Sequence, residues 1–163
     1  MPTAIVWFRK CLRLHDNAAL TWACESSEVD SILPVFIMDE ELGSEGTGGI
    51  GFNRARFLVQ SLRDLDDSLQ RELGLRLRIV RGGYLETMEA IIKGLDGSTP
   101  YLAYEYCSEP KSLSVSAEIS GWELSGGMDF ESRIFSGSHT LLDIEKTVSS
   151  ENYSNPKSMK DME

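Results

Sequence analysis

Hydrophobic and polar positions follow two different periods along most of the chain. Four short apolar runs are bounded by polar or glycine-rich residues, which is the pattern of buried strands. They are residues 4–8, 31–38, 75–80 and 101–106. Three segments with helical spacing lie between them, at residues 17–26, 53–73 and 84–95. This alternation predicts an α/β fold in which a mostly parallel sheet carries helices on both faces.

The segment 53–73 is the clearest predicted helix of the chain. Its apolar stripe repeats at helical intervals and consists of Leu58, Leu62, Leu65 and Leu69. Gly74 follows at the position where a helix commonly ends on a left-handed glycine. The stripe therefore predicts a helix packed against one face of the sheet.

The pattern weakens after residue 110. A further helix is predicted at 114–124 and a fifth strand at 130–135. Residues 145–163 are polar and aperiodic, so we expect a disordered tail that cannot bury enough apolar surface to offset its ordering. The sequence thus predicts a five-stranded α/β domain at 1–143 and a divergent polar tail at 144–163.

Composition and charge narrow the classes of function. The 163 residues carry a formal net charge of −10, which argues against direct nucleic-acid binding by this chain. No apolar run is long enough to span a bilayer, so no membrane association is expected. The three cysteines are odd in number and widely spaced, which predicts reduced thiols, no metal site, and a location in the nucleus or cytoplasm.

Basic residues follow the first predicted strand directly. Arg9 and Lys10 come at its carboxyl end, where open α/β sheets bind their ligands, and Arg13 follows shortly after. One interpretation is a pocket for a polar or anionic ligand. The other is that Arg13 pairs with Asp16 and that Arg9 and Lys10 are solvated. Asn17 and Asp16 are typical of a helix start.

Two further groups of candidates lie at strand ends. Glu105 and Glu109 follow the fourth strand and could accept hydrogen bonds from a pterin or flavin-like ring, or could be ordinary surface carboxylates. Phe36, Met38 and Asp39 end the second strand, although the first two share a face and are typical of plain core.

The segment 46–51 fits the pattern GxGxxG but is a poor dinucleotide site. The fingerprint belongs directly after a first strand, and here it follows the second strand by several residues. Glu40, Glu41 and Glu45 precede it and would repel a pyrophosphate. A surface loop is the better interpretation.

Five stretches in order carry a family resemblance. They read WFRKCLRLHDNAAL (7–20), NRARFLVQSLRDLD (53–66), LRIVRG (77–82), YEYCSEP (104–110) and SHTLLD (138–143). Together they resemble the amino-terminal α/β domain of the cryptochrome and DNA photolyase family, which has a Rossmann-like sheet. The second stretch is similar to the animal cryptochrome and (6-4) photolyase branch.

The resemblance implies a pocket for an antenna chromophore, either a reduced folate or a deazaflavin. In the family the basic turn of Arg9 and Lys10 borders this pocket. In folate-binding relatives, the position of Glu109 and the one before it, here Ser108, contact the pterin. Cys107 stands where the family often has Asp. The alternative implied by cryptochromes is a protein–protein interaction module with a vestigial pocket.

The resemblance also implies what this chain is expected to lack. Family members bind FAD, and photolyases bind flipped lesions, in a carboxyl-terminal helical domain. The chain ends shortly after SHTLLD, so we expect a truncated form without FAD, without catalytic residues and without repair activity of its own. The family's electron-transfer tryptophans belong to that helical domain, and Trp7 is expected to be a core residue. His139 is expected to have a structural or hinge role.

Overall fold

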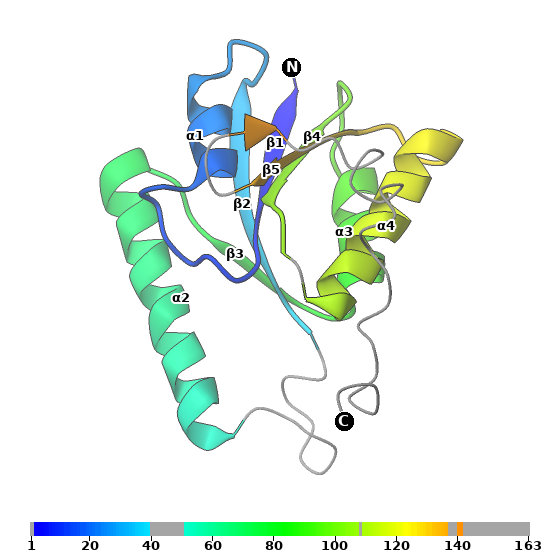
Figure 1. Ribbon diagram of the computed structural model, residues 1–163. Coiled ribbons are helices and arrows are strands. Elements are labelled where there is room, and N and C mark those ends of the chain that lie inside the picture. The colour runs from blue at the N-terminus through cyan, green and yellow to red at the C-terminus, as the bar shows by residue number, and fades with distance from the viewer. Residues whose placement is uncertain (1, 40–50, 108, 137–139, 142–163) are drawn as a thin grey trace, which may run out of the picture.

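The computed structural model describes residues 2–39, 51–107, 109–136 and 140–141. Within these residues, one sheet has the strand order β3-β2-β1-β4-β5-β6 (Figure 1). The strands are β1 (Thr3–Phe8), β2 (Ser31–Met38), β3 (Arg78–Arg81), β4 (Tyr101–Glu105), β5 (Glu131–Ser136) and β6 (Thr140–Leu141). The helices are α1 (Ala18–Glu25), α2 (Phe52–Leu73), α3 (Tyr84–Lys93) and α4 (Pro110–Ser125).

The strands β1 to β5 pair in parallel, and β6 pairs antiparallel with β5. The predicted five-stranded, mostly parallel sheet is therefore confirmed. The two-residue strand β6 was not predicted, because so short a segment carries no periodicity of its own. Since the chain leaves β1 towards β2 and later crosses to β4 on its other side, β1 lies at the point where the strand order reverses.

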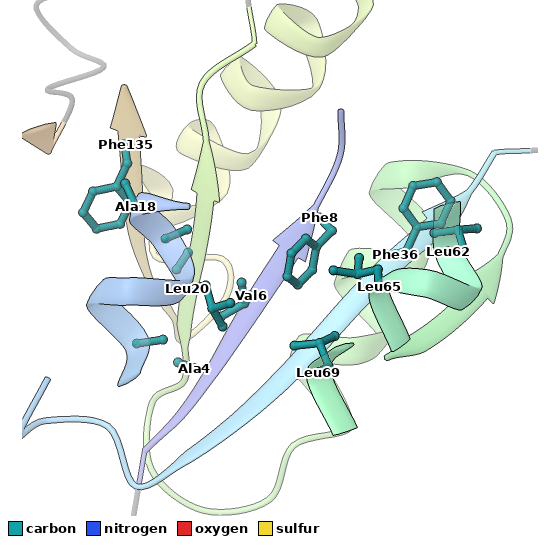
Figure 2. Packing of buried hydrophobic residues seen from close by; sticks show 13 residues of the cluster. Ala4, Val6, Phe8, Ala18, Leu20, Phe36, Leu62, Leu65, Leu69 and Phe135 are labelled. Atoms are coloured by element: carbon teal, nitrogen blue, oxygen red, sulfur yellow. The ribbon is translucent and has the colours of Figure 1, made fainter. Parts of the chain in front are cut away.

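Helices cover both faces of the sheet (Figure 1). On the α1 and α2 face, Phe8 of β1 lies beside Leu65 of α2, and Val6 lies beside Leu20 of α1 (Figure 2). The opposite face packs β-strand side chains against α3 and α4, and its buried members include Ile5, Trp7, Val35, Ile37, Met88, Leu102, Tyr104 and Ile119. Burial on both faces explains why β1 reads as a continuous apolar run.

The predicted stripe of α2 faces the core. Leu62, Leu65 and Leu69 are buried, and Leu58 packs partly buried beside them. Gly74 ends the helix with φ 68°, a left-handed conformation that glycine adopts without steric cost. Five residues after the start of α2, Phe57 is largely solvent-exposed, so the first part of the helix extends beyond the packed core.

Several predicted boundaries were wrong. The third strand begins at Arg78 instead of residue 75, because the Leu77 N–H donates to the Asp66 carboxylate (2.8 Å) and not to the sheet. The helix α4 begins at Pro110, which suits a first helical turn because its missing N–H needs no partner there. Pro34 lies inside β2 but one residue before pairing with β3 begins at Val35.

Three sequence-based predictions lie on residues that the structure does not describe. They concern the GxGxxG loop up to residue 50, His139, and the tail at 144–163. Across the described helices, none is both long enough and apolar enough to cross a membrane.

Candidate functional site

A cavity of about 540 Å³ opens at the carboxyl ends of β1 and β2. The ends of these strands and the first turns of α2, α3 and α4 form its walls. Its lining residues are Trp7, Phe8, Arg9, Lys10, Leu12, Phe36, Ile37, Asn53, Arg54, Phe57, Leu58, Ser61, Tyr84 and Ser112. Its volume falls within the range of roughly 300–1,000 Å³ that is typical of small-molecule sites.

Arg9 lies at the back of this cavity and is half-buried. Its guanidinium stacks 4.7 Å from the ring centre of Trp7 and 5.4 Å from that of Tyr104. It also donates a hydrogen bond to the Ser116 hydroxyl of α4 at 3.2 Å. Burial lowers the pKa of Arg9 below its usual value, as expected for a cation removed from water. The rings and Ser116 thus hold a fixed positive charge beside the cavity.

Lys10 and Glu109 form an ion pair between the β1 turn and the start of α4. The Lys10 Nζ lies 3.0 Å from Glu109 Oε2, and both side chains are largely exposed. Lys10 lines the cavity and Glu109 does not. The Glu109 carboxylate therefore lies outside the cavity but is paired with Lys10, one of its lining residues.

Glu105 is directed towards α1 and not into the large cavity. Its Oε1 accepts a hydrogen bond from the Ala18 N–H at 3.3 Å, next to the N-cap residue Asn17, whose Oδ1 accepts from Leu20 N–H at 3.0 Å. A carboxylate at a helix start satisfies a free N–H and complements the helix dipole. The pKa of the neighbouring Cys11 thiol is raised, mainly by burial and secondly by the Glu105 carboxylate.

The crevice between β1 and β4 is therefore almost filled. The space remaining there, which Arg9, Lys10, Asn17 and Glu105 help to line, measures about 20 Å³, close to the volume of one water molecule. A ligand site at the strand reversal was the expectation for this fold. The large cavity lies one strand further along, between the ends of β1 and β2.

The residues that end β2 divide between the cavity and its surroundings. Phe36 lines the cavity, whereas Met38 packs partly buried on the core face beneath α2. Asp39 is buried and pairs with Lys111 of α4 at 2.5 Å. The structure therefore brings Arg9, Lys10 and Phe36 together and places Met38, Asp39, Glu105 and Glu109 outside the lining. Ser108 lies outside the described residues.

Sequence reasoning missed the helical residues of the site. Arg54 and Phe57 come from the first turns of α2, Tyr84 opens α3, and Ser112 belongs to α4. The sequence signal that could have found the first two is Phe57 itself, a large aromatic residue outside the leucine stripe of this helix. Tyr84 packs 5.8 Å from the Trp7 ring, and burial raises the pKa of its hydroxyl.

The lining is aromatic and cationic. Arg9, Lys10 and Arg54 contribute positive charge, and no carboxylate belongs to the described residues of the lining. The rings of Phe36, Phe57 and Tyr84 surround these cations, although the chain as a whole carries a net charge of −10. Such a cavity suits a flat aromatic ligand with negative charge.

Comparison with known families identifies the family of this chain. The family model described as DNA photolyase matches residues 4–158. This chain belongs to the DNA photolyase family. The resemblance inferred from the five sequence stretches is thereby confirmed, and its family is known for FAD and antenna cofactors.

The curated relatives belong to the expected branch. The chain is 38% identical over 145 residues to cryptochrome-1 of Spalax judaei, covering 89% of this chain and 23% of that protein. It is 36% identical over 146 residues to the (6-4) DNA photolyase of Arabidopsis thaliana, covering 85% and 25%. The chain therefore spans about a quarter of the length of these relatives.

Solved structures of the family share the fold. The cryptochrome of Synechocystis sp. PCC6803 matches with a TM-score of 0.69 and 27% identity, covering 83% of this chain and 27% of that one. An archaeal photolyase from Sulfolobus tokodaii matches with a TM-score of 0.64 and 26% identity, covering 82% and 29%. The Sulfolobus tokodaii structure contains two FAD molecules, which are reported to imply a novel light-harvesting cofactor in that protein.

Proposed function

We propose that this photolyase-family domain binds a light-harvesting chromophore in the cavity at the carboxyl ends of β1 and β2. The observation that carries the proposal is the lining itself, in which Arg9, Lys10 and Arg54 face a roughly 540 Å³ space walled by aromatic rings. Aromatic walls contact the faces of a planar ring system, and the cations attract its negative charge.

The same lining favours a deazaflavin over a reduced folate. A pterin ring presents N–H donors, and these need carboxylate or carbonyl acceptors. The candidate carboxylates are engaged elsewhere, since Glu105 accepts from Ala18 N–H and Glu109 pairs with Lys10. A deazaflavin ring has fewer N–H donors than a pterin and so depends less on these carboxylates, while the cations of the lining attract the negative charge that either ligand carries.

The alternative function is docking of a protein partner at the mouth of the cavity. Phe52 and Phe57 support it, because they are 80% and 71% exposed on the first turns of α2. Phe57 also lines the cavity. A chromophore and a docked side chain would therefore compete for the same space, and binding of the small molecule alone separates the two functions.

The test is a fluorescence and absorbance titration of the purified chain. It uses a deazaflavin, a reduced folate and FMN as separate probes. We expect micromolar binding of the deazaflavin, weaker binding of the folate, and loss of affinity in Arg54→Ala. Arg63→Ala on the same helix, outside the lining, is the matched control. Failure of every probe to bind would contradict the chromophore proposal and leave partner docking as the function of the site.

Repair or signalling by a longer protein that contains this domain is a separate proposal. It rests on the relatives named (6-4) DNA photolyase and cryptochrome-1, of which this chain covers about a quarter. Its test is an assay of DNA repair and of bound FAD in such a longer protein. From this chain alone we expect neither, and FAD that co-purifies with it in stoichiometric amount would contradict that expectation.

A further inference from the structure

The strand β3 is an open edge of the sheet. It pairs with β2 on one side only, and its outward N–H and C=O groups have no partner among the described residues. Arg78 and Arg81 are exposed, and Ile79 is 48% exposed. Unpaired edges of this kind are templates for an additional strand.

An apolar groove runs beside this edge on the α3 face of the sheet. It has a volume of about 580 Å³. Arg78, Glu86 and Thr87 contribute polar groups to its lining, and the apolar part comes from Leu33, Val80, Ala90, Ile91 and Leu95. Arg78 and Val80 face this groove, whereas Ile79 and Arg81 face the α2 side, because successive strand residues alternate between faces. A strand added at the edge would therefore place every second side chain over the groove.

The charges of the edge select the partner. Neither Arg78 nor Arg81 forms an ion pair with another described residue, although the chain as a whole is strongly acidic. Arg76, just before the strand, already pairs with Asp66 at 2.8 Å. On the α2 side of the edge, the exposed Arg81 guanidinium complements carboxylates on a neighbouring strand.

We propose that β3 accepts an extended acidic peptide as an added strand, with alternating apolar residues seated in the groove beside α3. The partner is a protein segment in which Glu or Asp alternates with Val, Ile or Leu. Its carboxylates contact Arg81 on the α2 side, and its backbone pairs with the outer edge of β3. This site is separate from the cavity at the ends of β1 and β2, so it does not depend on the chromophore proposal.

The test uses a labelled peptide in which glutamate alternates with valine. Its binding to the whole chain is measured by fluorescence anisotropy. Arg81→Glu replaces an attractive contact by a repulsive one, so we expect Kd to rise by about tenfold. Arg78 lies on the groove face, away from the peptide's carboxylates, so Arg78→Glu should raise Kd less. Arg63→Glu on α2, an exposed arginine away from the edge, should leave Kd within about twofold.

Two controls separate strand addition from simple charge attraction. The same peptide with alternate amides N-methylated keeps its charge but loses the backbone hydrogen bonds, so it should not bind. Amide NMR signals of 78–81 and of the groove should shift on binding. The proposal is overturned by equal binding of the methylated peptide, by an equal effect of Arg63→Glu, or by no binding at all. Concentration-dependent shifts of the same amides without peptide would identify self-pairing and overturn it too.

Discussion

Replacing Arg9 by Met should separate the binding role of this residue from its structural role. Met keeps the length and apolar contacts of the side chain, so the packing over Trp7 and Tyr104 survives while the charge is lost. The chain then loses two cation–ring contacts and the 3.2 Å hydrogen bond to Ser116.

The energetic effects on folding nearly cancel. Each cation–ring contact contributes about 0.5–2 kcal/mol and the hydrogen bond about 1 kcal/mol. Against this, Arg9→Met no longer buries a charge, and that burial is unfavourable enough to lower the pKa of Arg9. We therefore expect the free energy of unfolding to change by about 1 kcal/mol or less. Affinity for an anionic chromophore should fall by about 10- to 100-fold, because a hydrogen bond to a charged group contributes about 1.5–3 kcal/mol.

Urea unfolding of the free protein and a fluorescence titration with the deazaflavin measure the two quantities separately. Arg63→Met, on the exposed side of α2, controls for the loss of one positive charge. The reasoning would be refuted if Arg9→Met left affinity unchanged. It would also be refuted if stability fell by about 3 kcal/mol or more, since that loss would make Arg9 chiefly a structural residue.

Three other predictions concern the frame that holds the site. Leu69→Ala should destabilise the fold by about 2–5 kcal/mol in urea unfolding because Leu69 is fully buried, whereas Leu73→Ala, 42% exposed, should cost less than about 1 kcal/mol; equal losses would contradict the packing of α2. Asn17→Ala should cost about 1 kcal/mol by removing the cap of α1, and Asp16→Gly should not destabilise because Asp16 has φ 52°; a neutral Asn17→Ala would exclude the cap role. Burial raises the pKa of Tyr104, so the unfolded state loses its proton first and stability should fall as pH rises past the ordinary value of 10.0. Tyr104→Phe should reduce that alkaline loss and cost less than about 1 kcal/mol at neutral pH, since the buried hydroxyl has no hydrogen-bond partner among the described residues; an unchanged pH profile would contradict this.

The fold was predictable because its elements carry strong local patterns. The apolar run of β1 is continuous, and the leucine stripe of α2 repeats at helical spacing. The start of β3 was not predictable in the same way. Leu75 and Leu77 continue the alternation of a strand, but a carboxylate eleven residues earlier takes the Leu77 N–H. A tertiary hydrogen bond of this kind leaves no periodic signal in the sequence.

Part of the lining of the candidate cavity was among the residues singled out from the sequence, and for an identifiable reason. Arg9 and Lys10 could be found because ligands of open sheets lie at strand ends, and this rule needs only the strand boundary. Arg54 and Tyr84 come from helix starts, and only the folded arrangement brings them to β1. Glu105 and Glu109 occupy the predicted ends, but a helix N–H and Lys10 satisfy them. The sequence indicates at which strand end a side chain lies, but not which group it contacts in the folded chain.

A crystal structure of this chain with a bound deazaflavin would test the central claim most directly. The account predicts a planar ring between the aromatic walls of the cavity, with a negatively charged group within hydrogen-bond distance of Arg9, Lys10 or Arg54. A chromophore bound elsewhere on the domain, or an empty cavity at saturating ligand, would contradict it.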